Sequence, residues 1–565
     1  MNGYLTEESA TLSLKRPWLV TLYLVALIAT VIVLPMIFLG NVSGHDFQPH
    51  VASWIEAAGQ WREGIIFPRW AAGANTGFGE PRFIFYPPGS WILGAALGSV
   101  LPWRMAPGAF IWISIFIAGM SMWKLAREWL PASQAIAAAL FFAANPYHLA
   151  LAYYRSDFAE LLASSLFPLM LCGAFGIFRK GWRRVPLLAI AFAAIWLSNA
   201  PAAVVATYSL ALILGAACIV CQSIRPLILG GSGMAVGFGV AAFYLVPAWF
   251  EQRWVQIANA VATIYDPLRN FLFTRVNDPD FIRFNWKISA LAVSVIFFTV
   301  VAIGLSFRQR AERSQVWWLL ALLSLAAIFL MLPPSAWLWR HLPQLKFLQF
   351  PWRWLLPLNL ALAFFAAMVS GRWQWIWWLT LTCAISATGV TIAGDTMWDS
   401  EDVPALVEDV RSGHGYDGIE GFQPREANAD ELDDELPLVA AVDPESGEIG
   451  PAESIQVNVQ KWSAEKKIFD AKSDEPATLA LKLLNFPAWQ LEVDGKSVNT
   501  SSAPQAGQLL VPLPAGTHHI EVVFHRTRDR TIGLLISGLF TSGLLVAGIF
   551  TLRRRATRRL TSTSA

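Results

Sequence analysis

A short polar segment follows the first long apolar run of the chain and reads Gly44-His45-Asp46-Phe47-Gln48-Pro49-His50. A carboxylate just past the end of a membrane helix can face a cavity at the bilayer surface, where partial loss of water strengthens it as a general base. Asp46 is therefore a candidate catalytic base. Two other interpretations stay open: Asp46 caps a helix that starts near Pro49, or it shares a metal site with His45 and His50.

A second acidic group lies near another predicted helix end. Asp157 and Glu160 are three residues apart and so share one face of a helix. Glu160 falls inside an apolar run, and an ionisable residue within a membrane span indicates function by default. Its obvious partner is Arg155. We expect either a functional group or a buried ion pair that ties two helices together.

Several arginines lie at predicted helix ends on the same side of the membrane: Arg69, Arg82, Arg155, Arg253 and Arg353. Guanidinium forks match phosphate oxygens, which suits a lipid phosphate or pyrophosphate arriving from the bilayer. The alternative is interfacial snorkelling with aromatic stacking. All but Arg253 join His45, His50, Tyr86 and Glu251 as candidate substrate-binding residues. For Glu251 a structural role is the alternative.

The composition indicates what must position these groups. Apolar types make up 55% of the 565 residues, charged types only 15%, and the mean hydropathy is +0.46. A soluble protein carries about 25% charge, so soluble, disordered and collagen-like classes are excluded. A net charge of +2 is too small for a nucleic-acid binder. The 27 tryptophans suit many membrane interfaces.

A membrane helix needs about 20 apolar residues. By this measure we expect twelve spans: 17–39, 106–126, 131–151, 158–178, 184–199, 201–221, 226–248, 287–307, 315–333, 353–370, 373–393 and 531–552. The run 84–101 is short and contains Tyr86-Pro87-Pro88-Gly89, and we expect it to lie in the interface or re-enter it.

The distribution of Lys/Arg clusters between the two sides of the membrane supports the prediction that 84–101 does not cross it. Lys/Arg clusters in short loops are cytoplasmic as a rule. If 84–101 does not cross, the clusters fall on one side together, including 179–184, 308–313 and 553–559. Both termini are then cytoplasmic in a multi-pass protein of the plasma (inner) membrane. The first loop, 40–105, and the large segment 394–530 face outward.

The chain divides into three predicted parts. Residues 1–393 form a transmembrane domain, 394–530 an outer domain, and 531–565 a last span with a basic tail. Within the outer domain, 395–453 is strongly acidic and is expected to be an extended surface region. Residues 454–526 alternate apolar and polar types, and Asp494-Gly495 is a hairpin signal. The class is therefore mainly α, with a C-terminal β-sandwich-like domain before the last span.

The motifs resemble a known family. The runs GHDFQPH, FPRW and GFGEPRFIFYPP, then YRSDFAE and LQFPWRW, are similar to the YfhO-like family, also called the 6-pyruvoyl-tetrahydropterin-synthase-related membrane family. FPAWQLEVDG and VPLPAGTHHIEVVF resemble the outer β-domain of that family. Its members are placed in the GT-C superfamily of membrane glycosyltransferases. The pterin-synthase label gains no support, because the eight histidines are scattered rather than clustered for zinc.

The resemblance implies a function. A GT-C enzyme would transfer a sugar from a polyprenyl-phosphate donor to an envelope glycan, lipid or protein on the non-cytoplasmic face. Asp46 would deprotonate the acceptor hydroxyl for inverting, in-line attack. Glu160 or Asp157 would orient acceptor or base, and arginines would stabilise the leaving phosphate. No cofactor is required by the residues, although a divalent cation is compatible with them.

Two rival hypotheses come from other classes. A transporter or flippase for lipid-linked sugars would share an arginine-lined cavity, but the inverted repeats typical of transporters are not visible in the sequence. A non-enzymatic envelope assembly factor would bind a partner through its β-domain and tolerate substitution of Asp46 and Arg155.

Overall fold

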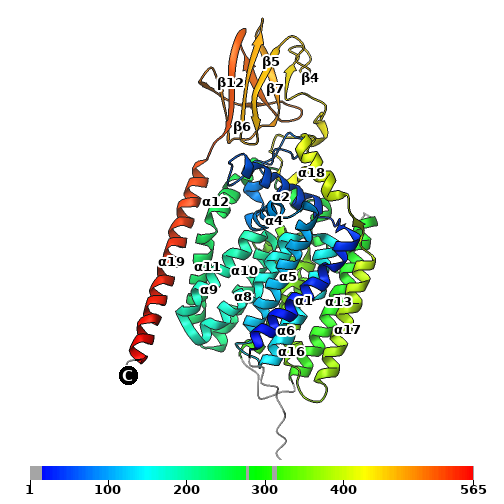
Figure 1. The fold of residues 1–565 in the computed structure, drawn as a ribbon, viewed down its shortest axis with the longest axis vertical. Coiled ribbons are helices and arrows are strands. Elements are labelled where there is room, and N and C mark those ends of the chain that lie inside the picture. The colour runs from blue at the N-terminus through cyan, green and yellow to red at the C-terminus, as the bar shows by residue number, and fades with distance from the viewer. Residues whose placement is uncertain (1–15, 275–278, 308–314, 564–565) are drawn as a thin grey trace, which may run out of the picture.

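The computed structural model describes residues 16–274, 279–307 and 315–563. A helical bundle forms the body of the molecule, and a strand-rich domain stands on one end of it (Figure 1). A long last helix descends from that domain along the side of the bundle. The predicted class, mainly α with a C-terminal β-domain before the last span, is confirmed. The basic cluster predicted at 308–313 lies outside the described residues.

The α-helices run as follows: α1 (Pro17–Leu39), α2 (Phe47–Arg62), α3 (Arg82–Phe85), α4 (Pro88–Val100), α5 (Ala106–Ala126), α6 (Ala132–Ala143), α7 (Pro146–Leu149), α8 (Phe158–Lys180), α9 (Val185–Ser198), α10 (Ala200–Val220), α11 (Arg225–Val240), α12 (Ala242–Glu251), α13 (Pro279–Phe307), α14 (Gln315–Leu330), α15 (Ala336–His341), α16 (Leu355–Met368), α17 (Gln374–Gly394), α18 (Asp402–Ser412) and α19 (Arg528–Thr563). Short 3₁₀ or π turns join many of them.

The count of twelve spans is not confirmed. In the described residues, eight helices are long and apolar enough to cross a membrane, or up to ten if each of two bent pairs is one span. Two differences account for the gap. The run Phe158–Ser198 counts once although it holds both α8 and α9, and α16 has only 14 residues. Every predicted span nevertheless falls on a helix of the bundle.

Glycines allow the helices of the bundle to approach closely. A Cβ at Gly173 on α8 would lie 2.7 Å from the Leu188 backbone of α9, so these two helices pack side by side as a hairpin. Gly237 on α11 would meet the Ala189 carbonyl oxygen at 2.9 Å. Without a hydrophobic drive between helices in lipid, such small residues permit the van der Waals contact that holds a bundle together.

The loop 40–105, which the sequence predicts to face outward and which we call the first outer loop, is a folded layer. It holds α2, α3 and α4, and α2 and α4 pack on each other. With 13 residues, α4 is about 20 Å long and cannot cross a hydrocarbon core of about 30 Å. This agrees with the prediction that 84–101 does not span. A two-residue ladder, β1 (Asn41–Val42) with β2 (Trp398–Asp399), ties the start of this loop to the end of α17.

The C-terminal domain has two five-stranded sheets, ordered β10-β11-β7-β3-β4 and β5-β6-β12-β8-β9. Their strands are β3 (Val439–Val442), β4 (Ile449–Gly450), β5 (Gln456–Ser463), β6 (Lys466–Ser473), β7 (Ala477–Leu484), β8 (Trp489–Val493), β9 (Lys496–Val498), β10 (Ser501–Ser502), β11 (Gln508–Leu513) and β12 (Gly516–Phe524). The predicted hairpin turn lies between β8 and β9, where Asp494 and Gly495 have φ of 52° and 73°. Positive φ at both positions is what a type I′ turn requires.

The β-domain shares its core with the outer loop. Trp70 is fully buried, and its ring lies 5.3 Å from that of Trp489 and 5.7 Å from that of Phe524. The acidic region 395–453 also differs from the expected extended surface. It contains α18, and Tyr416 is buried against the outer loop. A hydrogen bond from Tyr416 to Glu56 and the Arg82 guanidinium over the Tyr416 ring hold this part of the acidic region against the loop.

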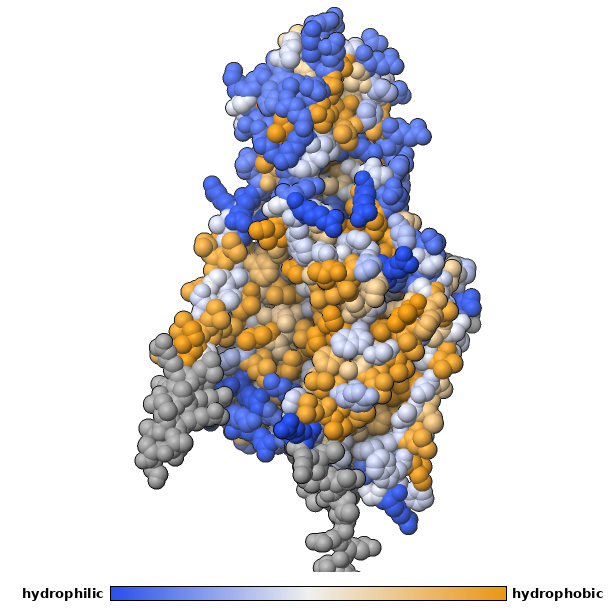
Figure 2. Space-filling view, in the orientation of Figure 1, coloured by the Kyte–Doolittle hydropathy of each residue, from blue (hydrophilic) through white to orange (hydrophobic). Residues whose placement is uncertain are grey.

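An apolar band crosses the helices between two hydrophilic ends (Figure 2). The β-domain lies beyond one end of the band, whereas the start of α1 and the far end of α19 lie toward the other (Figure 1). The band defines a membrane-spanning bundle. Asp46 and the outer loop belong to the end that carries the β-domain.

Candidate functional site

Asp46 occupies the N-cap position of α2, but its side chain does not cap that helix. Its carboxylate is bonded to the Arg155 guanidinium instead. The Asp46 backbone N–H also donates to the Arg155 carbonyl oxygen at 2.8 Å. A Cβ at Gly44 would overlap the Arg155 backbone, so glycine is required there. The two segments therefore hold the Asp46–Arg155 pair in place from both backbone and side chain.

Arg155 ends an irregular stretch of helix. The segment η2 (Ala150–Arg155) has π-helical hydrogen bonding, and Ser156 after it is left-handed, with φ of 53°. π-helical turns are rare and often lie at functional sites. The turn then places Asp157 at the N-cap of α8, where its Oδ1 accepts from the Glu160 N–H at 2.9 Å. Arg155, Asp157 and Glu160 thus point to one place.

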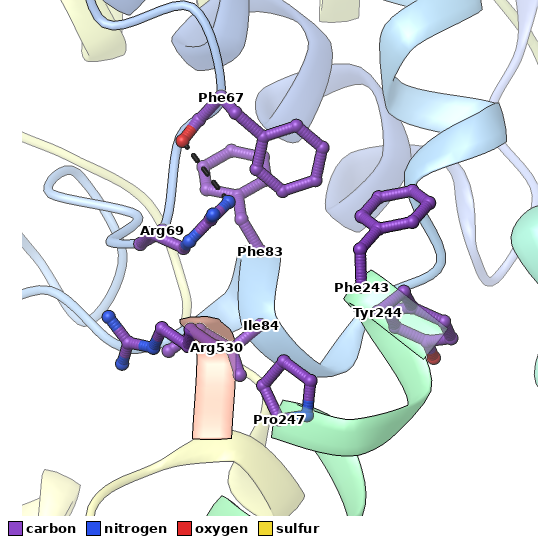
Figure 3. A pocket seen from close by; sticks show the side chains of 8 residues that line it. All are labelled: Phe67, Arg69, Phe83, Ile84, Phe243, Tyr244, Pro247 and Arg530. Carbon is purple, nitrogen blue, oxygen red and sulfur yellow. Dashed lines mark hydrogen bonds between the residues drawn. The ribbon is translucent and has the colours of Figure 1, made fainter. Parts of the chain in front are cut away.

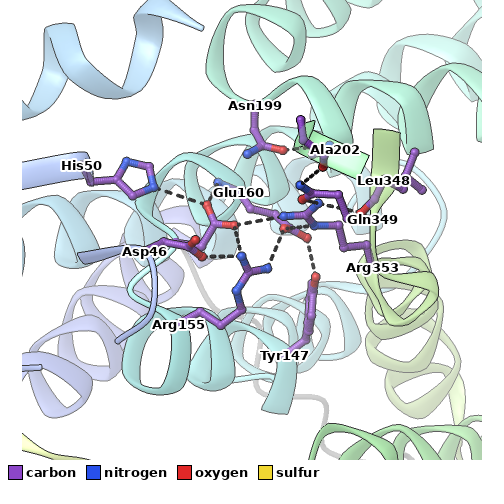
Figure 4. A network of polar contacts seen from close by, with 12 residues as sticks. Asp46, His50, Tyr147, Arg155, Glu160, Asn199, Ala202, Leu348, Gln349 and Arg353 are labelled. Carbon is purple, nitrogen blue, oxygen red and sulfur yellow. Dashed lines mark hydrogen bonds and ion pairs between the residues drawn. The ribbon is translucent and has the colours of Figure 1, made fainter. Parts of the chain in front are cut away.

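These three residues meet Arg353, which the sequence places almost two hundred residues away. Its Nε donates to Glu160 Oε2 at 2.9 Å, and its Nη2 lies 3.7 Å from Asp157 Oδ2 (Figure 4). Arg155 reaches Asp157 at 3.5 Å and Glu160 at 3.9 Å. The predicted partner of Glu160, Arg155, is therefore the more distant one, and Arg353 is the closer.

We call Asp46, Arg155, Asp157, Glu160 and Arg353 the charge network. Two further side chains bind to it, and neither was among the predicted site residues. Tyr147 donates its hydroxyl hydrogen to Glu160 Oε1. Gln349 accepts from Arg353 Nη1 at 3.1 Å. Tyr147 lies in Asn145-Pro146-Tyr147, where a proline interrupts the predicted span, and that interruption was the available signal. Gln349 lies in the quoted motif LQFPWRW, but its contact with Arg353 depends on the fold.

His50 and Tyr86 contact the network from the outer loop, and His45 borders it. His50 Nε2 lies 3.6 Å from Asp157 Oδ1 and 3.1 Å from the Tyr86 hydroxyl oxygen. His45 packs edge-on against Phe284 at 4.8 Å. Burial and the nearby Arg155 charge lower the pKa of His45. Burial opposes ionisation of Asp157, but Arg155, His50 and Arg353 together hold its pKa below the usual range.

Exposure separates Asp46 from the other members. The side chains of Arg155, Asp157, Glu160 and Arg353 are at most 6% exposed, whereas that of Asp46 is 33% exposed. Three carboxylates face two guanidiniums, so one negative charge is in excess when His50 is neutral. Asp46 is thus the carboxylate of the three that solvent reaches, and the buried groups hold it through Arg155.

Arg82 belongs to a separate cluster, which we call the loop latch: Glu56, Glu80, Arg82 and Tyr416. Arg82 Nε donates to Glu80 Oε1 at 2.6 Å, and the Arg82 guanidinium carbon Cζ lies 5.0 Å from the Tyr416 ring centre. Tyr416 donates to Glu56, whose pKa burial raises. Arg82 and Glu80 are fully buried. This geometry favours a structural role for Arg82 over phosphate binding.

Glu56, Glu80 and Tyr416 were not among the predicted site residues. Glu80 does lie in the quoted motif GFGEPRFIFYPP, whereas Tyr416 lies in the acidic region 395–453. Glu80 Oε2 also accepts from the Ile419 N–H at 3.0 Å. The latch therefore fastens the first outer loop to the segment after α18.

Arg69 and Glu251 lie at a third place, beside the start of α19. Arg530 binds both oxygens of Glu251 at 2.7 Å, which supports the structural alternative for Glu251.

Arg69 borders a small crevice with Phe67, Phe243 and Arg530 (Figure 3). Burial and the Arg530 charge lower the pKa of Arg69 to about 10. The cavity in this crevice has a volume of only about 10 Å³, which is too small for a lipid headgroup. The remaining arginine, Arg253, stacks on Phe250 at 3.9 Å.

A metal centre is not evident in the described parts of the chain, where no three His, Cys, Asp or Glu side chains are grouped to hold an ion. His50 turns to Asp157 and Tyr86, whereas His45 turns to Phe284. The two imidazoles that flank Asp46 in sequence therefore diverge. The residues present do not form the site that the metal interpretation requires.

Neither a protein-family model nor a curated protein matches the chain. Among solved structures it is similar to the oligosaccharyltransferase AglB of Archaeoglobus fulgidus in complex with an inhibitory peptide and a dolichol-phosphate, with 15% identity and a TM-score of 0.40 over 72% of this chain and 56% of that one. It is also similar to an apo oligosaccharyltransferase of Archaeoglobus fulgidus, with 15% identity and a TM-score of 0.37 over 72% and 57%. The match spans little more than half of those chains. The function of this chain must therefore be argued from its own residues.

Proposed function

We propose that this chain is a membrane glycosyltransferase of the GT-C kind that uses a polyprenyl-phosphate sugar donor on the non-cytoplasmic face. The observation that carries the proposal is the exposure of Asp46 at the edge of an otherwise buried charge network. The motif resemblance supports the same class. The acceptor would be an envelope glycan, lipid or protein.

In this mechanism Asp46 is the general base. The acceptor hydroxyl gives its proton to the Asp46 carboxylate, and its oxygen forms a bond to the anomeric carbon. The bond from that carbon to the phosphate oxygen breaks, and the phosphate leaves with the electron pair. Attack from the face opposite the phosphate inverts the configuration. A positioned base of this kind contributes about 10²–10⁴-fold.

Arg155 positions the base in the proposed mechanism. It is bonded to Asp46 and contacts Asp157 and Glu160, which Arg353 neutralises from the other side. Buried, fully partnered charges hold a side chain in one orientation, and orientation to within a fraction of an ångström is what proton transfer needs. Asp157 and Glu160 thus act through Arg155 rather than on the substrate.

The test is a product assay in proteoliposomes. Purified protein receives a mixture of polyprenyl-phosphate sugars and a membrane extract as acceptor. We expect sugar transfer by wild type, a loss of at least about 100-fold in Asp46→Asn, and full activity in Glu408→Gln, an exposed carboxylate on α18 at the same end. Donor movement across the bilayer by both proteins without transfer would overturn the enzyme proposal in favour of a flippase.

A further inference from the structure

A charged lipid-linked donor needs cations at the level of the bilayer surface, and the arginines of the charge network do not meet this need. Arg155 and Arg353 are at most 6% exposed and already face three carboxylates. A phosphate that approached them would meet Asp46 first. A phosphate site that serves Asp46 must therefore use other cations nearby.

Such cations lie on the first turns of α13, at the end of the bundle that carries the β-domain. Arg283 and Lys287 are four residues apart and so share one face of the helix. Arg283 is exposed, and the Lys287 side chain is 30% exposed. They share one carboxylate, Asp395, which is bonded to Lys287 and lies within electrostatic reach of Arg283. The group keeps one positive charge in excess.

Aromatic rings join this cation pair to Asp46. Lys287 Nζ lies 5.3 Å from the centre of the Tyr154 ring, and the Tyr154 and Phe284 rings are 6.4 Å apart. Phe284 in turn contacts His45, the neighbour of Asp46, and lies 6.2 Å from Trp352. We call Tyr154, Phe284 and Trp352 the aromatic wall. Mostly apolar and aromatic surfaces with a few convergent charges are typical of small-molecule sites.

The same end of α13 carries an exposed aromatic pair. Trp286 is 46% exposed and Phe273 is 44% exposed, and their rings pack edge to face at 5.5 Å. Exposed aromatic side chains at a helix end mark the headgroup level of a membrane protein. Arg283 and Lys287 therefore lie where the phosphate of a membrane-embedded lipid lies.

We propose that Arg283 and Lys287 bind the phosphate of an isoprenoid-linked donor, with its sugar against the aromatic wall between that phosphate and Asp46. The inference rests on the proposed function and deepens it. Lys287 lies at the Tyr154 end of the wall, whereas His45, the neighbour of Asp46, packs against Phe284. A sugar held along the wall would therefore have the leaving phosphate at one end and the base at the other, which in-line attack requires. Binding takes Lys287 away from Asp395, so Asp395 competes with the phosphate for the ammonium group.

This competition gives the test a matched pair of variants with opposite signs. Farnesyl phosphate is titrated into the full-length protein in phosphatidylcholine nanodiscs, and Kd is measured by native mass spectrometry. Arg283→Gln and Lys287→Gln should weaken binding at least about tenfold, whereas Asp395→Asn should tighten it, because the ammonium group is released. Lys346→Gln, which removes an exposed cation on another loop, should leave Kd unchanged.

Three outcomes would overturn the inference. The first is an unchanged Kd in Lys287→Gln that unfolds at the wild-type temperature. The second is equal weakening in Lys287→Gln and Asp395→Asn, which would make the pair a structural clamp between α13 and the end of α17. The third is equal competition by inorganic phosphate or by phosphatidylglycerol, which would show that the site does not recognise an isoprenoid phosphate.

The result is separable from the proposed function. Farnesyl phosphate binding that depends on Lys287, in a protein that transfers no sugar, would leave this site standing and remove the enzyme proposal. Sugar transfer that survives Arg283→Gln and Lys287→Gln would leave the enzyme proposal standing and remove this phosphate site.

Discussion

Arg155 and Arg82 are two buried arginines that face carboxylates at the same end of the molecule, yet their surroundings differ in one respect. Both partners of the Arg82–Glu80 pair are fully buried. Arg155 shares its charge with Asp157 and Glu160 inside and with Asp46, which is one-third exposed. Buried ion pairs are frequent enough in this chain that burial alone does not mark a site. The exposed carboxylate distinguishes the charge network from the loop latch.

The largest effect should come from breaking the charge network at its centre. Arg353→Met leaves Glu160 buried with only Tyr147 and the distant Arg155 as partners. Removing one member of a buried pair costs about 3–5 kcal/mol. We expect a large fall in the unfolding temperature in detergent and loss of sugar transfer together. An Arg353→Met protein with wild-type stability would mean that the network does not hold α8 against the segment before α16.

Lys467 extends the comparison of the buried arginines to a buried cation that, within the described residues, has no carboxylate within 4 Å. It lies at the start of β6, and its Nζ is 5.3 Å from the Trp462 ring centre and 5.6 Å from the Trp489 ring centre. Burial lowers its pKa from 10.5 to about 7. The unfolded chain takes up this proton below about pH 10.5 and the folded chain only below about pH 7. Stability is therefore lost as the pH falls between these values and is level below them.

Lys467→Met should remove that loss. The variant should gain roughly 4 kcal/mol over wild type at pH 7 and less than about 1 kcal/mol at pH 10, since each pKa unit corresponds to about 1.4 kcal/mol. Denaturant unfolding at the two pH values measures the difference. A gain of equal size at both pH values would show that packing, not the ammonium charge, is responsible.

A smaller effect should follow from loosening the loop latch. Tyr416→Phe deletes the hydroxyl that donates to the buried Glu56. An unsatisfied buried acceptor costs about 1–3 kcal/mol. We expect a modestly lower unfolding temperature, earlier proteolysis after α18, and sugar transfer per folded molecule close to wild type. Loss of transfer in a stable Tyr416→Phe protein would mean that the latch belongs to the reaction site.

Local patterns were enough to predict some parts of this structure. The helix end at Leu39, the short α4 and the hairpin at Asp494-Gly495 follow from hydropathy, length and turn chemistry. The predicted span 131–151 stops short, because a π-helical turn continues the helix to Arg155. Asp46 and Glu160 were identified because charges are rare next to apolar runs. These signals are all contained in a few consecutive residues.

Other parts could not be predicted, because they depend on contacts between distant segments. Arg353 and Arg82 have the same residue type and a similar aromatic setting in sequence, yet one meets Glu160 and the other Glu80. The same holds for Tyr416, whose acidic segment indicates an exposed chain although the ring is buried on the outer loop. Which carboxylate an arginine meets is decided by the packing of the helices.

The most direct test of the central claim compares two carboxylate-to-amide variants in one preparation. Asp46→Asn and Glu80→Gln are each measured for unfolding temperature and for sugar transfer per folded molecule. The account predicts that Asp46→Asn keeps its stability and loses at least about 100-fold in transfer, whereas Glu80→Gln loses several degrees of stability and keeps its transfer. Full transfer by a folded Asp46→Asn protein would contradict it.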